Sequence, residues 1–284
     1  MRLTSGKSLR IGCVKYLNAR PLIRGWRGQV DFDHPSALCK RLASGELDIA
    51  LVSSFEFLRN PIYRIVDDVS ISSDGPVYSV VIAHRGDFSE LEEIELDPAS
   101  QTGVNLLQCL LAELNLKACL IRNIDLQSVR PGGLQPAGSE TAENISARRT
   151  GKMPIFRGRL LIGDQAIRFR QEHAGEFRFW DLGEHWKKLI GLPFVYALWL
   201  IRPEVAHAEK IANRLRALRD ENFAHLDRLI AAETEFDRQF CARYYCEHLR
   251  FTFGEEEREG LRTFANLCAR YGLLEKQDPG LDLV

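Results

Sequence analysis

The sequence lacks an excess of charge of either sign. Its 284 residues include 38 Lys and Arg against 39 Asp and Glu, which gives a formal net charge of −1. Proteins that bind nucleic acid or an anionic membrane surface usually carry a positive field, so this composition predicts neither partner. With 45% hydrophobic and 27% charged residues, the chain is typical of a globular protein with one large or two modest cores.

The sequence also lacks a segment that would take the protein into or across a membrane. Its basic N-terminus has no apolar core of the about 7–15 residues that a signal peptide needs. The longest apolar run, Leu189 to Ile201, is shorter than the roughly 20 residues that span a bilayer, and it contains Gly191 and Pro193. We therefore expect a cytoplasmic protein.

Zinc-binding patterns and common catalytic motifs are absent as well. The seven cysteines are scattered, and no second pair accompanies Cys241 and Cys246, so we expect no metal site and a reducing compartment. The chain has no glycine-rich dinucleotide loop, phosphate-binding loop, GxSxG elbow or HExxH helix. These absences remove the best-known signatures of nucleotide-dependent enzymes, serine hydrolases and metalloproteases.

What is present is a regular alternation of strands and helices. Strands are expected over Leu9–Leu17 and Ile49–Val52, and two more end just before Ser100 and Asp164, each with a helix to follow. This rhythm predicts an α/β fold with a mainly parallel sheet, whose ligands bind at the carboxyl ends of the strands. After Pro203 the pattern becomes that of amphipathic scaffold helices.

Polar residues cluster at these strand ends, namely Asn18, Ser54, Ser100, Thr102 and Asp164. Hydroxyls beside free N–H groups at helix starts are good receptors for a carboxylate. A hydroxyl at a helix start is also an ordinary cap, and for Ser54 and Ser100 both interpretations stand. Several such helix starts meeting in one cleft would indicate a small anionic ligand.

Two long apolar strands, Val77–Ala83 and Phe194–Ile201, stand apart from this rhythm. They could carry the chain out to a second lobe and back, or they could both be central strands of one sheet; periodicity does not decide. The polar, Gly- and Pro-rich segment 127–159 has no clear period, and we expect a flexible surface loop there, with a lid as the alternative.

Five motifs follow one another along the chain. They are "YLNARPL" from Tyr16, "GELDIALVSSFEFLRN" from Gly45, "ISSDGPVYSV" from Ile71, "LIGDQAI" from Leu161 and "DLGEHWKKLIGLPFVYALW" from Asp181. Together they resemble the chorismate dehydratases of the futalosine route to menaquinone. The resemblance covers most of the chain, in order, and the combination is highly specific.

The resemblance implies a two-lobed fold like the type II periplasmic solute-binding proteins, with two crossover strands and C-terminal helices. Residues 1–78 and 200–284 would then form the first lobe, and residues 79–199 the second. It also implies a carbon–oxygen lyase that removes water from chorismate, without a cofactor, to give 3-[(1-carboxyvinyl)oxy]benzoate. No pattern in the sequence predicts an oligomeric state.

Matched residue by residue, the family's active-site asparagine is Asn18, its serine is Ser79 and the "IGD" aspartate is Asp164. The chain departs from the family's usual Ser-Arg-Thr-Ser bend, which removes one cation and one hydroxyl from the expected substrate contacts. The expected substrate-binding residues are Ser54, Ser100, Thr102 and Gly103.

Loss of the C3 hydrogen and the C4 hydroxyl makes the chorismate ring aromatic, so the reaction needs positioning more than a powerful base. The base is either the substrate's own enolpyruvyl carboxylate, which we favour, or Asp164, whose alternative role is a helix cap. Two other functions remain open. One is an enzyme like the 1,4-dihydroxy-6-naphthoate synthase of the same pathway, and the other is a non-catalytic carboxylate-binding protein or sensor.

Overall fold

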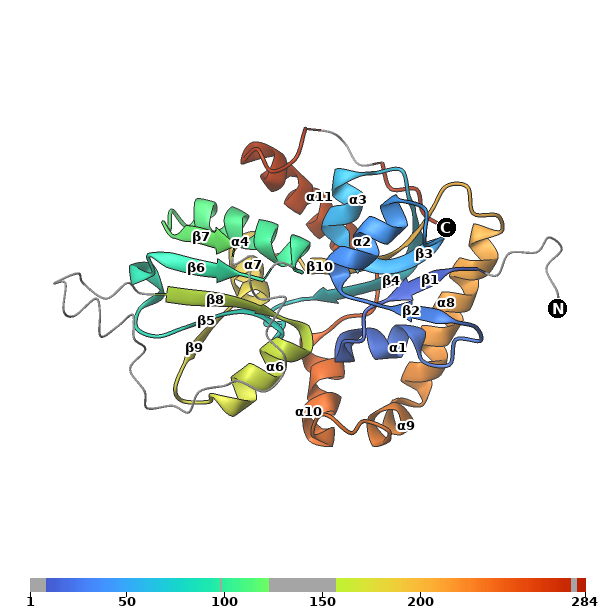
Figure 1. The fold of residues 1–284 in the computed structure, drawn as a ribbon, viewed down its shortest axis with the longest axis horizontal. Helices are drawn as coiled ribbons and strands as arrows, with labels where there is room; N and C mark the ends of the chain where they lie inside the picture. The colour runs from blue at the N-terminus through green and yellow to red at the C-terminus, as the bar shows by residue number, and fades with distance from the viewer. Residues whose placement is uncertain (1–8, 98, 123–156, 277–279) are drawn as a thin grey trace.

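The chain forms two five-stranded sheets that lie side by side (Figure 1). The computed structural model describes residues 9–97, 99–122, 157–276 and 280–284. The first sheet has the strand order β2 (Val30–Phe32), β1 (Ile11–Cys13), β3 (Ile49–Ser53), β10 (Phe194–Ile201) and β4 (Arg64–Ser73). The second has the order β7 (Cys119–Arg122), β6 (Glu93–Leu96), β8 (Arg157–Ile162), β5 (Val80–His84) and β9 (Arg178–Asp181).

Helices follow most of the strands, as the sequence predicts. A 3₁₀ turn over Leu17–Ala19 follows β1, another over Phe88–Glu90 follows β5, and a π-helical turn over Tyr244–His248 follows α10. The α-helices are α1 (Arg20–Ile23), α2 (Pro35–Ala43), α3 (Ser54–Arg59), α4 (Gln101–Glu113), α6 (Gly163–Glu172), α7 (Leu182–Ile190), α8 (Ala208–Ala224), α9 (Leu226–Ala231), α10 (Arg238–Arg243) and α11 (Glu255–Arg270).

Both sheets are mixed rather than mainly parallel. β1 runs parallel to β2 and β3, and β6 runs parallel to β7 and β8, which is the strand–helix alternation seen in the sequence. β10 is antiparallel to β3 and β4, and β5 is antiparallel to β8 and β9. The antiparallel strands are the ones that begin where the chain arrives from the other sheet, and no local pattern reports their direction.

The chain passes between the sheets twice. It leaves the first sheet after β4 and enters the second at β5, so the strand expected from Val77 begins at Val80 and Ser79 precedes it. It returns after α7, and β10 lies in the first sheet from Phe194 onward, although the boundary expected from the sequence falls at 199. The reason is that β10 pairs with β4 from Phe194 and with β3 from Ala197, so it belongs to the first sheet from its first residue. The division into lobes itself stays a prediction.

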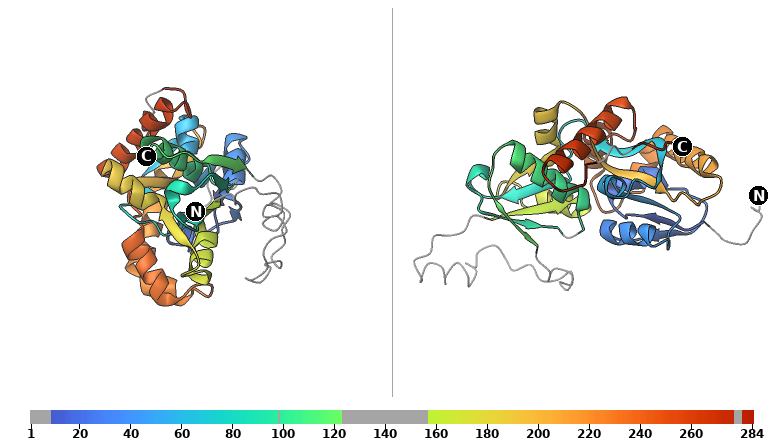
Figure 2. Two further views of the ribbon diagram at one scale, coloured as in Figure 1. Left: turned by 90° about the vertical axis from the view of Figure 1, so that its left-hand side faces the viewer. Right: turned by 90° about the horizontal axis from the view of Figure 1, so that it is seen from above.

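A cluster of buried aromatic rings joins the two halves. The ring centroids of Trp186 in α7 and Phe194 in β10 are 5.0 Å apart, and Phe264 in α11 packs against both rings at 6.1 and 4.9 Å. From above, α11 lies over the junction of the two sheets (Figure 2), where it contacts β10 and α4. The C-terminal helices therefore act as the expected scaffold.

Most of the predicted flexible loop 127–159 lies outside the described residues. Residues 157–159 belong to strand β8, so this end of the prediction was wrong. The physical reason is cross-strand pairing: Arg157 pairs with Glu93 and Arg159 with Glu95, both on neighbouring β6. Charged residues on the open face of a strand look like loop residues when the sequence is considered alone.

Candidate active site

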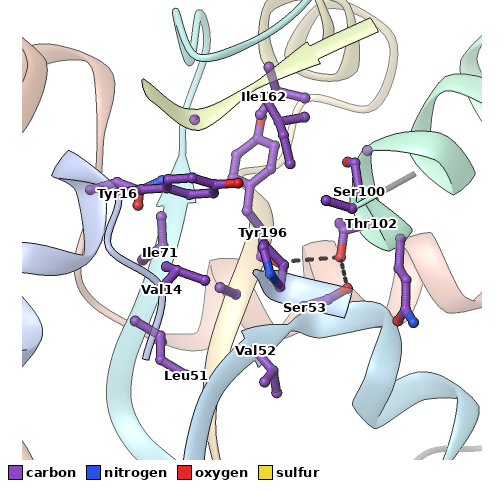
Figure 3. A pocket seen from close by; sticks show the side chains of 18 residues that line it. Val14, Tyr16, Leu51, Val52, Ser53, Ile71, Ser100, Thr102, Ile162 and Tyr196 are labelled. Carbon is purple, nitrogen blue, oxygen red and sulfur yellow. Dashed lines mark hydrogen bonds between the residues drawn. The ribbon is translucent and has the colours of Figure 1, made fainter. Parts of the chain in front are cut away.

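A pocket lies between the two sheets, and both supply its walls (Figure 3). The first sheet contributes Tyr16 and Asn18 beyond β1 and the end of β3; the second contributes the start of α4 and the β8–α6 junction. The lining residues are Val14, Tyr16, Asn18, Pro35, Leu51, Val52, Ser53, Ile71, Val80, Ala99, Ser100, Gln101, Thr102, Gly103, Ile162, Gly163, Tyr196 and Ala197. Strand and helix ends thus meet here as expected for an α/β fold.

A wider cavity adjoins this pocket. Tyr16 and Ala99 line both, so the two cavities share part of a wall. Its wall carries charges of both signs, including Lys40, Asp97 and Arg159. Burial raises the pKa of the Asp97 carboxyl, and the amide of Ala99 opposes that rise.

Thr102 ties the two halves together at one end of the pocket. Its hydroxyl oxygen lies 2.5 Å from Ser53 Oγ and 3.3 Å from Ser54 Oγ, accepts a bond from the Phe55 amide at 3.3 Å and donates to the Tyr196 carbonyl at 3.3 Å. Figure 3 shows Thr102 between Ser53 and Tyr196. The start of α4 in the second half is thereby bonded to the starts of α3 and β10.

The expected substrate-binding residues fall into two groups. Ser100, Thr102 and Gly103 line the pocket, whereas Ser54 is fully buried and donates its hydroxyl to the Val195 carbonyl at 2.7 Å. Ser100 is the N-cap of α4, yet its side chain makes no capping bond. A Cβ atom at Gly103 would lie 2.4 Å from Ser100 Oγ, so glycine is needed there for the hydroxyl to keep its place.

Asn18 lines the pocket from the 3₁₀ turn that follows β1. Its Oδ1 atom is buried and has no hydrogen-bond partner among the residues that the structure describes. Such an unpaired buried acceptor costs about 1–3 kcal/mol of folding free energy. It is therefore a good candidate for an atom that binds a ligand.

Ser79 lies directly behind this wall, with only 1% of its surface exposed. Its Oγ accepts a hydrogen bond from the Tyr244 hydroxyl at 2.7 Å, and its carbonyl accepts one from the Gly163 amide at 2.8 Å. Val80, the next residue, lines the pocket, but Ser79 itself is not among the lining residues. The placement of Ser79 and Asn18 in one cleft thus stays a prediction.

Asp164 joins the second half to the turn that carries Asn18. It lies in the first turn of α6, and its Oδ1 accepts a hydrogen bond from the Leu17 amide at 2.7 Å. Its Oδ2 is 3.9 Å from the guanidinium of Arg20, which also pairs with Glu233. Burial raises the pKa of Asp164, and the Leu17 amide and Arg20 oppose that rise. Asp164 does not line the pocket, and it bonds to another element rather than capping its own helix.

Sequence reasoning missed the tyrosines of this region. Tyr16 and Tyr196 line the pocket, and Tyr244 contacts Ser79 from behind. A Cβ atom at Gly163, whose φ is +57°, would lie 2.7 Å from the Tyr16 ring, so the "IGD" glycine leaves room for that ring. The motifs that contain Tyr16 and Tyr196 were the available signals. Tyr244 has none, because a buried tyrosine on a helix is usually a core residue.

The described residues contain neither a metal-binding cluster nor a membrane-spanning helix. Among the described residues, no group of three or more His, Cys, Asp and Glu side chains is placed to hold a metal ion. No helix in the described ranges is both long and apolar enough to cross a membrane. The pocket walls carry apolar groups, hydroxyls and the side-chain amides of Asn18 and Gln101 as the groups that could bind a ligand.

Solved structures of similar fold define the class of protein. A protein of Archaeoglobus fulgidus aligns with a TM-score of 0.64 at 14% identity, over 94% of this chain and 98% of its own. The periplasmic aliphatic sulphonate binding protein SsuA of Escherichia coli aligns with a TM-score of 0.58 at 15% identity, over 98% of this chain and 91% of its own. The chain thus has the predicted periplasmic-binding-protein fold, with the pocket between its two halves.

The chain belongs to the menaquinone biosynthesis family, whose sequence model matches residues 9–132 and 142–270. A curated relative, the chorismate dehydratase of Thermus thermophilus, is 30% identical over 277 residues, which cover 90% of this chain and 93% of the relative. The resemblance found from the five sequence motifs is thereby confirmed.

Proposed function

We propose that the protein is a chorismate dehydratase, a hydro-lyase that converts chorismate to 3-[(1-carboxyvinyl)oxy]benzoate. Family membership and the Thermus thermophilus relative support this function. The observation that carries it is the unpaired Asn18 Oδ1 in a pocket that also presents the hydroxyls of Ser53, Ser100 and Thr102. Such a site suits a ligand rich in hydroxyl and carboxylate groups.

The reaction itself needs few protein groups. The C3 proton goes to a base, its electron pair forms the C3–C4 double bond, and the C4–O bond breaks. The departing hydroxide takes up one proton, so that water alone is lost. Because the ring becomes aromatic, the protein's main task is to hold the substrate and the departing hydroxyl in one geometry.

We assign the base to the substrate's own enolpyruvyl carboxylate. Asp164 is less well placed, because one of its oxygens accepts the Leu17 amide, the other faces Arg20, and the side chain is not among those lining the pocket. In this proposal Asp164 supports the turn that bears Asn18. Its raised pKa follows from burial and needs no catalytic explanation.

The direct test is to incubate the purified protein with chorismate and separate the products by chromatography. Formation of the aromatic enolpyruvyl ether is the expected result. Tight binding of chorismate without any product would favour the sensor function instead. Product that forms only from a later intermediate of the pathway would favour the naphthoate synthase-like alternative.

Asp164→Asn tests the assignment of the base. The amide keeps an oxygen for the Leu17 N–H, so we expect kcat to fall by less than about tenfold, because no proton-transfer group is lost. A complete loss of turnover in a folded variant would identify Asp164 as the base.

The same variant has a signature in stability. An Asp with a raised folded-state pKa stabilises the fold most below its unfolded pKa of about 3.9, and this contribution is lost as the pH rises through the folded-state value. The unfolding free energy of the wild type should therefore fall relative to that of Asp164→Asn as the pH rises from about 4. Parallel pH profiles of the two proteins in urea melts would contradict the raised pKa.

A further inference from the structure

Tyr244 lies behind the site and makes a polar contact that packing alone does not require. It is fully buried and opens the π-helical turn Tyr244–His248, a local widening of the helix that is often found at functional sites. Its hydroxyl reaches across to the other half of the molecule and donates to Ser79 Oγ at 2.7 Å. A phenylalanine would fill the same space without that bond.

The backbone around Ser79 is fixed from several sides. Tyr78 has φ +67°, a conformation that is strained for a side chain of its size. The Asp181 carboxylate holds the strained turn by accepting the amides of Val77 at 3.0 Å and Tyr78 at 2.8 Å, and the Gly163 amide binds the Ser79 carbonyl. The position of Ser79 Oγ is therefore determined before any ligand arrives.

The bond from Tyr244 determines which further hydrogen bonds the Ser79 hydroxyl can make. A serine hydroxyl has one proton to donate and two lone pairs to accept with. Because Tyr244 donates to Ser79 Oγ, one lone pair is engaged and the Ser79 proton is directed elsewhere. A hydroxyl that accepts one hydrogen bond also becomes a stronger donor in the next, because bonds in a chain polarise one another.

Asn18 supplies an acceptor on the pocket side. It lines the pocket from the 3₁₀ turn after β1, and its buried Oδ1 has no hydrogen-bond partner among the described residues. Burial raises the pKa of Tyr244, so its hydroxyl keeps the proton that it donates to Ser79.

We propose that Tyr244 is a positioning residue that sets Ser79 as a donor toward one hydroxyl of the substrate, for which the unpaired Asn18 Oδ1 is the acceptor. The inference rests on the proposed dehydration of chorismate. A hydroxyl group donates one bond and accepts others, so the departing C4 hydroxyl matches this pair. Donation from Ser79 strengthens as the C–O bond breaks and negative charge develops on oxygen.

The test is a double-mutant cycle of Tyr244→Phe and Ser79→Ala, measured with chorismate. Tyr244→Phe should lower kcat about 10–100-fold, the size typical when a supporting residue of a site is removed. KM should change by less than about threefold, because the lost interaction acts in the transition state. Since Tyr244 acts through Ser79, the double variant should be no slower than Ser79→Ala alone.

Tyr63→Phe is the matched control. Tyr63 is also buried, at 1% exposure, and its hydroxyl accepts a hydrogen bond from the Asn60 side chain at 3.3 Å; neither residue lines the pocket. Tyr63→Phe should lower the melting temperature by about as much as Tyr244→Phe does, while its kcat stays at the wild-type value.

Three outcomes would overturn the inference: losses from Tyr244→Phe and Ser79→Ala that multiply, a kcat of Tyr244→Phe equal to that of the control, or an effect on KM alone. Absence of product with the wild type would instead overturn the proposed function.

Discussion

Replacing Ser79 or Asn18 by alanine is expected to lower kcat and kcat/KM together by about 10²–10³-fold, the usual effect of removing one preorganised hydrogen-bonding group. Asn18 presents an unpaired acceptor in the pocket, and Ser79 is held by the Tyr244 hydroxyl and the Gly163 amide. Neither side chain is large, so little packing is lost. Chromatographic assay of product from chorismate measures the rates, and thermal melts show whether each variant folds.

Ser70→Ala provides the control for loss of a buried serine hydroxyl. Ser70 is fully buried on β4; its hydroxyl donates to the Thr252 carbonyl and lies 3.2 Å from Ser72 Oγ, and none of these residues lines the pocket. The melting temperature of Ser70→Ala should fall at least as much as that of Ser79→Ala, with turnover unchanged. Wild-type turnover in both Ser79→Ala and Asn18→Ala would remove these two residues from the site.

Asp181→Ala is expected to cost the largest amount of stability, about 3–5 kcal/mol of unfolding free energy. Asp181 is 2% exposed, and its two oxygens accept the amides of Val77, Tyr78 and Glu184, with the Arg170 guanidinium at 3.6 Å. Alanine would leave three amides without their acceptor and would release the strained turn before Ser79. Turnover should fall as well, because that turn places the Ser79 hydroxyl.

Urea unfolding followed by circular dichroism measures this change. Asp87→Ala is the comparison, because Asp87 also caps a helical turn, accepting the amide of Ser89 at 2.9 Å, but it is exposed to solvent. The unfolding midpoint should move much further for Asp181→Ala than for Asp87→Ala. Equal shifts would mean that burial adds nothing to the value of the Asp181 cap.

The sequence predicts local structure well where the signal is local. The helices α4, α6 and α11 lie where periodicity places them, and Asn18, Ser100 and Thr102 line the pocket because strand ends meet there. Contacts between distant segments carry no such signal. Asp164 bonds to Leu17, 147 residues away, and Tyr244 to Ser79, 165 residues away. Neither partner is marked by the residues around it.

The direction of β10 could not be predicted for the same reason, because it depends on contacts between distant segments. An apolar run such as Phe194–Ile201 reports burial on both faces but not which strands flank it, so the two interpretations of the long strands were equivalent until the sheet order was seen. The partner of Ser54 was also not predictable from nearby residues. Ser54 lies at a helix start as expected, yet its hydroxyl donates to the Val195 carbonyl on β10.

The strand order also has a consequence for synthesis on the ribosome. β3 and β4 do not pair with each other, because β10 lies between them, so both keep an open edge until Ile201 has emerged. The stretch from β5 to α7 holds every strand of the second sheet and can fold while the first is still incomplete. The facing edges of β3 and β4 thus stay unpaired while more than a hundred further residues are synthesised. Chaperone binding during this period would protect the chain from aggregation.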